Sequence, residues 1–162
     1  MNYIQKLLKL NGLAYETGQF IRIKPHHIMT HDNSSAVMSK FAKLSDTIRD
    51  PAQLVLTIDH DIQNPNQAAK YEKIGEFAKR HGLNFFPPHS GIGHQIMVEQ
   101  GFAFPNTIVV ASDSHSNMYG GVGCLGKLYI RVGWYDLTNV GTPVVRTDAA
   151  AIWATSYTWL VS

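Results

Sequence analysis

The chain has 162 residues, of which 44% are hydrophobic and 16% are charged, with a formal net charge of +2. This length and composition suit one compact globular domain and exclude a disordered polyelectrolyte. The weak net charge argues against nucleic acid or a membrane surface as a partner, and no apolar run reaches the ~20 residues of a membrane span. The single cysteine, Cys124, excludes an internal disulfide.

Apolar runs of strand length alternate with helical patterns along the chain. The first ten residues, MNYIQKLLKL, are basic and loosely amphipathic, which favours a surface helix over a targeting presequence. We predict strands over 20–23, 53–58, 83–86 and 107–111, and further helices over 34–43, 65–81, 94–100 and 148–155. This alternation predicts an α/β fold with a mainly parallel sheet.

The helix over 65–81 has the clearest boundaries. Asn64 is a good N-cap, and Pro65 suits the first helical position because its missing N–H is not needed there. The last turn is basic, and Gly82 then predicts the end of the helix.

The polar clusters fall where predicted elements end. All eight histidines lie between His26 and His115. Four groups stand out: His31-Asp32-Asn33 before a helix, Asp59-His60-Asp61 after the strand 53–58, His94 at a helix start, and Asp113-Ser114-His115 after the strand 107–111.

Open α/β sheets bind ligands beyond the carboxyl ends of their strands, so we expect the two groups that follow strands to share one cleft. A histidine beside a carboxylate can exchange a proton near neutral pH, and hydroxyl and imidazole groups can donate hydrogen bonds to a substrate carboxylate. The alternatives are that each Asp-His pair merely caps a turn, or that the histidines form a mononuclear zinc site, although no His-x-x-x-His spacing supports zinc.

Several longer motifs carry a family resemblance. The stretches IKPHHIMTHDNSSAVMSKF, GIGHQIMVEQGFAFPNTIVVASDSHSNMYGGVGCLG and GTPVVRTDAAAIWAT resemble the first domain of the aconitase and isopropylmalate-isomerase superfamily. Within it, SNMYGG and RTDAAA are similar to the homoaconitase branch. The resemblance runs from about Tyr15 to Thr155. It implies that residues 1–162 form an incomplete three-layer αβα domain.

The resemblance also implies a function. The family's homoaconitase branch is a hydro-lyase that interconverts homocitrate, cis-homoaconitate and homoisocitrate in lysine biosynthesis, in the mitochondrial matrix. It implies a [4Fe–4S] cluster held by three cysteines, whose open iron acts as a Lewis acid. By position in the motifs, the implied catalytic residues are Asp59, His60, His94, Asp113 and His115, and the implied substrate-binding residues are His31 and Ser114.

The sequence departs from the family in two ways that matter. Cys124 does not occupy a cluster-ligand position, so we expect a buried structural thiol and a fragment that holds no cluster and is inactive without the downstream domains. The stretch KLYIRVGWYDLTNVG, about 127–141, interrupts the family pattern. We interpret it as an insertion and, as a hypothesis, a translated intron; a genuine loop insertion is the alternative.

Three other interpretations stay open. The chain is a non-catalytic truncated gene product, a relative of aconitase or of the 3-isopropylmalate dehydratase large subunit, or a stand-alone metal-dependent hydrolase. In the first interpretation the chain has no independent role.

Overall fold

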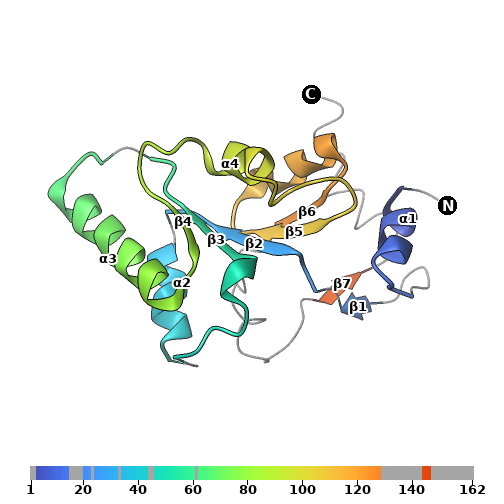
Figure 1. The fold of residues 1–162 in the computed structure, drawn as a ribbon, viewed down its shortest axis with the longest axis horizontal. Helices are drawn as coiled ribbons and strands as arrows, with labels where there is room; N and C mark the ends of the chain where they lie inside the picture. Colours follow the sequence, from blue (N-terminus) through green and yellow to red (C-terminus); the bar gives the residue numbers. More distant parts are fainter. Residues whose placement is uncertain are drawn as a thin grey trace.

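The computed structural model describes residues 3–14, 20–22, 24–32, 34–43, 46–60, 62–128 and 144–146. The helix expected over 148–155 and most of the insertion over 127–141 lie outside these residues. The described part is built around one parallel sheet with helices on both of its faces (Figure 1). The expected α/β fold class is confirmed.

Five parallel strands form the sheet in the order β4-β3-β2-β5-β6. Their bounds are β2 His27–Thr30, β3 Leu54–Thr57, β4 Asn84–Phe86, β5 Ile108–Ala111 and β6 Leu125–Leu128. The sequence analysis predicted β3, β4 and β5 and missed β2, which is the central strand, and β6. The chain runs outward from β2 to β4 and then returns to the other side of β2 as β5. This reversal places a topological switch point between β2 and β5, which is where open α/β sheets bind ligands.

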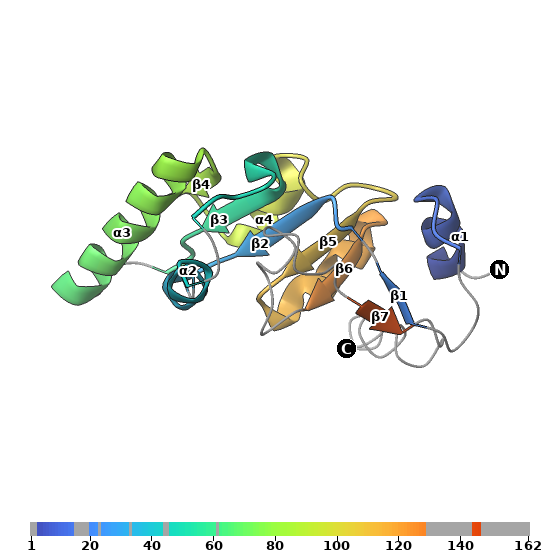
Figure 2. The ribbon, with the colours of Figure 1, turned by 90° about the horizontal axis from the view of Figure 1, so that it is seen from below.

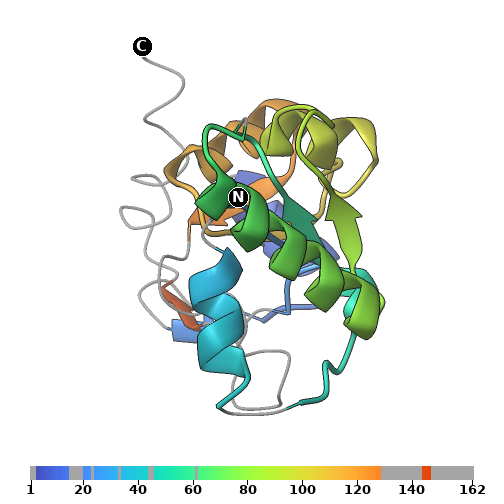
Figure 3. The ribbon, with the colours of Figure 1, turned by 90° about the vertical axis from the view of Figure 1, so that its left-hand side faces the viewer.

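Side chains alternate along each strand, so every strand presents residues to both faces of the sheet. Helices cover both of these faces. Leu54 and Leu56 of β3 pack with α2 (Ser34–Phe41) and α3 (Pro65–His81), whereas Val55 belongs to the core on the opposite face. That opposite core also includes residues of α4 (Gly93–Glu99) and of the 3-10 helix η2 (Ser114–Val122). Figure 3 shows α2 and α3 side by side on their face. The described part therefore has three layers.

The N-terminal helix α1 (Tyr3–Leu10) covers the far end of the sheet. Its Leu7 and Leu8 are fully buried against Ile108 of β5 and Leu125 of β6. The predicted helix is confirmed. Figure 2 shows α1 at the end of the molecule opposite α3, beside a separate antiparallel pair. That pair joins β1 (Phe20–Arg22) to β7 (Val144–Arg146).

The predicted limits of α3 are confirmed. Asn64 Oδ1 accepts a hydrogen bond of 3.0 Å from the Gln67 backbone N–H, Pro65 is the first helical residue, and Gly82 ends the helix in the left-handed conformation with φ of 66°. A 3-10 turn over Pro51–Gln53 leads into β3. Each of these features follows from local chemistry that the sequence displays.

One glycine allows η2 to lie directly on the sheet. A Cβ at Gly126 of β6 would overlap the carbonyl oxygen of Ser116 and lie 2.9 Å from the ring of Tyr119. Only glycine permits this approach of two backbones. Gly126 thus allows η2, which carries Ser114 and His115, to pack against β6. Among the residues that the structure describes, none of the helices has the length and apolar character to cross a bilayer.

Candidate active site

Three adjacent strands deliver polar residues to the same edge of the sheet. Asp59 and His60 follow β3, His31 and Asp32 follow the central strand β2, and Asp113 follows β5. Because β2 lies between β3 and β5, its polar residues connect the two groups that the sequence analysis expected to share a cleft. The group lies at the carboxyl edge beside the switch point.

Asp113 is the centre of the group. His31 Nε2 lies 3.2 Å from its Oδ2, and His94 Nε2 lies 3.0 Å from its Oδ1. His115 contacts Oδ1 twice, with its ring Nδ1 at 2.8 Å and its backbone N–H at 2.7 Å. A carboxylate only accepts hydrogen bonds, so each of these three imidazoles carries a proton on the nitrogen that faces Asp113.

The environment keeps Asp113 ionised. Burial acts to raise the pKa of its carboxyl, but hydrogen bonds from the His115 backbone and from the His94 and His115 rings outweigh that effect. The pKa is therefore held well below its usual range. A carboxylate that stays charged holds its three imidazole neighbours in fixed orientations.

His94 is held from both sides. It is the second residue of α4 and is buried, and its Nδ1 lies 2.7 Å from the hydroxyl of Tyr119. Tyr119 has no exposed surface, and its ring crosses that of His94 with 5.4 Å between centroids. Burial, with the nearby Cys124 thiol, raises the pKa of Tyr119 far above its usual range, so the phenol keeps its proton.

A second acid–imidazole pair lies on the β3 side. His60 Nδ1 donates to Asp32 Oδ2, and Asp32 Oδ1 accepts a hydrogen bond of 3.2 Å from the Asp59 backbone N–H. The sequence analysis grouped His60 with its neighbour Asp59, but the structure pairs it with Asp32. Asp59 instead directs its Oδ1 toward Gly93 at the start of α4, where that atom is buried.

The site has both closed and open sides. The side chains of His60 and His115 are 71% and 66% exposed, and Ser114 is exposed as the first residue of η2. His31 Nδ1 is buried and, in the described part of the chain, accepts no hydrogen bond. The exposed groups can reach a ligand, the buried His94 fixes the geometry beneath it, and His31 Nδ1 keeps a lone pair that the described residues leave unused.

The comparisons with known proteins agree with this architecture. A family model described as Aconitase family (aconitate hydratase) matches residues 5–140. The chain belongs to the aconitase family.

This aconitase-family chain also has close curated relatives. The mitochondrial homoaconitase of Neurospora crassa is 52% identical over 151 residues, which cover 91% of this chain and 17% of the relative. Those of Mycosarcoma maydis and Candida glabrata are 51% and 53% identical over 151 residues, covering 91% of this chain and 18% and 20% of the relatives. The chain thus spans about a fifth of the length of these relatives.

The residues of this aconitase-family chain do not fit an iron–sulfur cluster. Such clusters need several cysteine thiolates, and the sequence holds one cysteine. Cys124 is 1% exposed, its Sγ accepts from the Thr107 hydroxyl at 3.3 Å, and burial raises its pKa, so it remains a thiol. The expected burial of Cys124 is confirmed.

The geometry of the site does allow a single metal ion. One ligand atom each from His94, Asp113 and His115 lies within 4.8 Å of the others, which is close enough to hold one ion. His94 comes from α4, whereas Asp113 caps η2 after β5 and His115 lies in η2, so no sequence spacing joins His94 to the other two.

Two residues of the site had no assigned role in the sequence analysis. Asp32 stood in a polar cluster, but nothing in its spacing identified His60 as its partner. Tyr119 stood within the motif SNMYGG and carried only the family resemblance. A prediction of the central strand β2 would have identified Asp32, because the end of that strand places Asp32 between the group after β3 and the group after β5.

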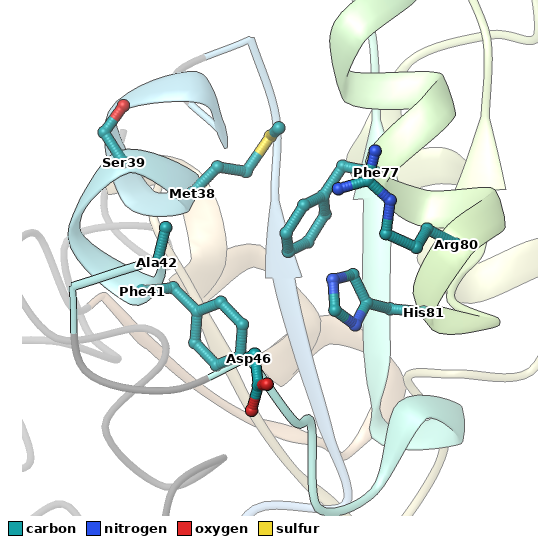
Figure 4. A pocket seen from close by; sticks show the side chains of 8 residues that line it. All are labelled: Met38, Ser39, Phe41, Ala42, Asp46, Phe77, Arg80 and His81. Atoms are coloured by element: carbon teal, nitrogen blue, oxygen red, sulfur yellow. The ribbon is translucent and has the colours of Figure 1, made fainter.

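A hollow of the described part lies elsewhere. A pocket of about 400 Å³ opens between α2 and α3 and shares no residue with the histidine group (Figure 4). Its walls include the rings of Phe41, Phe77 and His81, which pack edge to face or tilted on one another. The full lining is Met38, Ser39, Phe41, Ala42, Asp46, Phe77, Arg80 and His81.

Proposed function

We propose that this chain is part of a hydro-lyase that reversibly dehydrates a small tricarboxylic acid, as expected of a homoaconitase. The substrates in this proposal are homocitrate, cis-homoaconitate and homoisocitrate, and the compartment is the matrix of the mitochondrion, the organelle that the relatives' names give. The observation that carries the proposal is the convergence of three imidazoles on the ionised Asp113 at the switch point of an aconitase-family sheet.

Substrate binding falls to two donors on the open side and to one acceptor beneath them, His31 Nδ1. Ser114 offers a hydroxyl and His115 an exposed imidazole, and both suit a substrate carboxylate. His31 offers its buried Nδ1, which has no protein partner in the described part and suits a substrate hydroxyl as donor. A tricarboxylate carries enough carboxylates to engage these groups and others from the rest of the longer enzyme.

Loss of water needs a proton on the departing hydroxyl and a base for the proton on the neighbouring carbon. We assign the first task to His60, which is exposed and is oriented by Asp32, with Asp59 beside it. His94 and Asp113 form the fixed pair beneath the substrate. The base that takes the carbon-bound proton is assigned to no residue of this chain.

The partner of this chain in the proposal is the remainder of the same enzyme. A [4Fe–4S] cluster belongs to the full-length enzyme, with its cysteines outside this chain. With one buried cysteine, the chain alone supplies binding and proton-transfer groups only, and we expect no turnover from it.

Ligand titration tests the site without requiring turnover. The chain is titrated with cis-homoaconitate and followed by NMR of its histidine side chains. We expect saturable shifts at His31 and His115, and affinity at least about tenfold weaker in His115→Ala, because charged hydrogen bonds contribute about 1.5–3 kcal/mol. His89→Ala, which removes an exposed imidazole outside the group, is the matched control and should bind unchanged.

Three outcomes would count against the proposal. Equal binding by His115→Ala and the His89→Ala control would place the ligand elsewhere. Hydration of cis-homoaconitate by the chain alone, after anaerobic incubation with iron and sulfide, would contradict the assignment of cluster and base to other parts of the enzyme. Binding of Zn²⁺ with release of ammonia or phosphate from a hydrolase substrate would favour the metal-hydrolase alternative.

A further inference from the structure

We propose that Tyr119 is a positioning residue, whose buried hydroxyl fixes His94 as the imidazole tautomer with its proton on Nε2, facing Asp113. The importance of this tautomer for catalysis rests on the proposed function. Its existence does not, because it follows from contacts within this chain.

The first step of the argument is the hydrogen-bond polarity. Asp113 stays a carboxylate and can only accept, so the 3.0 Å contact with His94 requires a proton on His94 Nε2. In the neutral ring Nδ1 is then a lone pair, and it needs a donor. The Tyr119 hydroxyl lies 2.7 Å away and keeps its proton, so it donates to Nδ1.

The second step is that Tyr119 cannot easily move. Its side chain is fully buried in the core shared by α4, η2 and β5, and its ring lies against the Cα of Gly126, where a Cβ would come within 2.9 Å. Its hydroxyl makes no other hydrogen bond in the described part of the chain. The immobile Tyr119 ring therefore holds its hydroxyl against a single acceptor, His94 Nδ1, and so fixes the orientation of that imidazole.

The third step concerns how the Tyr119–His94 contact affects the site. Both ring nitrogens of His94 are occupied, and its side chain is only 9% exposed, so His94 is closed to substrate. The chain Tyr119–His94–Asp113 therefore orients the carboxylate from below. His115, with its side chain 66% exposed on the same carboxylate oxygen, is left as the group that meets the ligand. We thus place His94 with the positioning residues.

The test is NMR of the ¹⁵N-labelled full chain without any ligand. In the wild type we expect His94 in the Nε2–H form, together with a slowly exchanging Tyr119 hydroxyl proton that shows a nuclear Overhauser contact to the His94 ring. In Tyr119→Phe the hydroxyl signal is lost and the His94 Nδ1 resonance moves toward that of an unbonded ring nitrogen. Exchange of the Nε2 proton with solvent becomes about tenfold faster, since one lost hydrogen bond changes an opening equilibrium by roughly that factor.

Tyr71→Phe is the matched control. Tyr71 is also buried, but it packs in the core on the opposite face of the sheet, so His94 signals should not change. Asp113→Asn gives the reverse test, because the amide can donate to Nε2; the His94 proton should then move to Nδ1 and point at Tyr119.

Three results would overturn the proposal. They are a wild-type His94 that carries its proton on Nδ1, a Nδ1 resonance that is the same in the wild type and in Tyr119→Phe, and an equal response to Tyr71→Phe. The wild-type measurement stands even if a variant fails to fold. None of these measurements depends on substrate, so a failure here is distinct from a failure of the proposed hydro-lyase function.

Discussion

Replacing Gly93 with alanine tests how closely the site depends on the packing of α4 against β3. Gly93 is the first residue of α4 and is buried. A Cβ there would overlap Thr57 Oγ1 and lie 2.7 Å from Asp59 Oδ1. The overlap with Thr57 Oγ1 is the tighter of the two, and restoring an ordinary contact distance of about 3.4 Å there requires a shift of about 1.1 Å. The next residue is His94, so the shift passes directly to the site.

The expected magnitude follows from two opposing effects. Overpacking of this kind costs about 1–3 kcal/mol, whereas alanine is preferred over glycine in helices by up to about 1 kcal/mol. We expect Gly93→Ala to lower the free energy of unfolding by about 1–2 kcal/mol. A shift of about 1.1 Å would also lengthen the 3.0 Å contact from His94 Nε2 to Asp113 Oδ1 beyond hydrogen-bond range.

Urea denaturation and NMR of the His94 ring measure the two effects separately. Gly121→Ala is the matched control, because a Cβ at Gly121 would meet nothing within 4 Å. We expect the control to change stability by less than about 0.5 kcal/mol and to leave His94 unaffected. If Gly93→Ala is as stable as the control and its Nε2–H signal is unchanged, the reasoning about α4 is wrong.

Four further predictions concern other parts of the chain. The pKa of Asp113 is lower in the folded chain than its ordinary value of 3.8, so the ionised carboxylate stabilises the fold above that pH and loses this effect as pH falls. In urea titrations, the difference in free energy of unfolding between wild type and Asp113→Asn should therefore shrink from about pH 5 to about pH 2. Asp32→Ala should cost about 1–2 kcal/mol in the same assay and His60→Ala under about 0.5 kcal/mol, because only Asp32→Ala also removes the acceptor of the half-buried Asp59 backbone N–H; equal losses would contradict this. Cys124 should react with iodoacetamide only as fast as the fold opens, and prompt labelling of the native chain would refute its burial. For residues 127–141, we propose a translated intron, and a mature messenger that retains these codons would exclude it.

The sequence alone determined the elements whose ends carry local signals. The limits of α3 follow from a cap at Asn64, a proline at the first turn and a glycine in the left-handed conformation. The strands β3 and β5 are short, almost entirely apolar runs with polar residues immediately after them, and this pattern is typical of a parallel sheet covered on both faces. These signals sufficed for the fold class and for the edge where the site lies.

Only the tertiary structure decided which strand is central and which acid meets which imidazole. The strand β2 has the four residues HIMT, follows Pro25 and His26, and shows no period that separates it from a loop; it is a strand because β3 and β5 pair with it on either side. Its position brings Asp32 to His60 across 28 residues, and the packing of η2 brings Tyr119 to His94 across 25. Periodicity and capping act over one or two turns of chain, whereas these pairings depend on strand order and on the packing of separate layers.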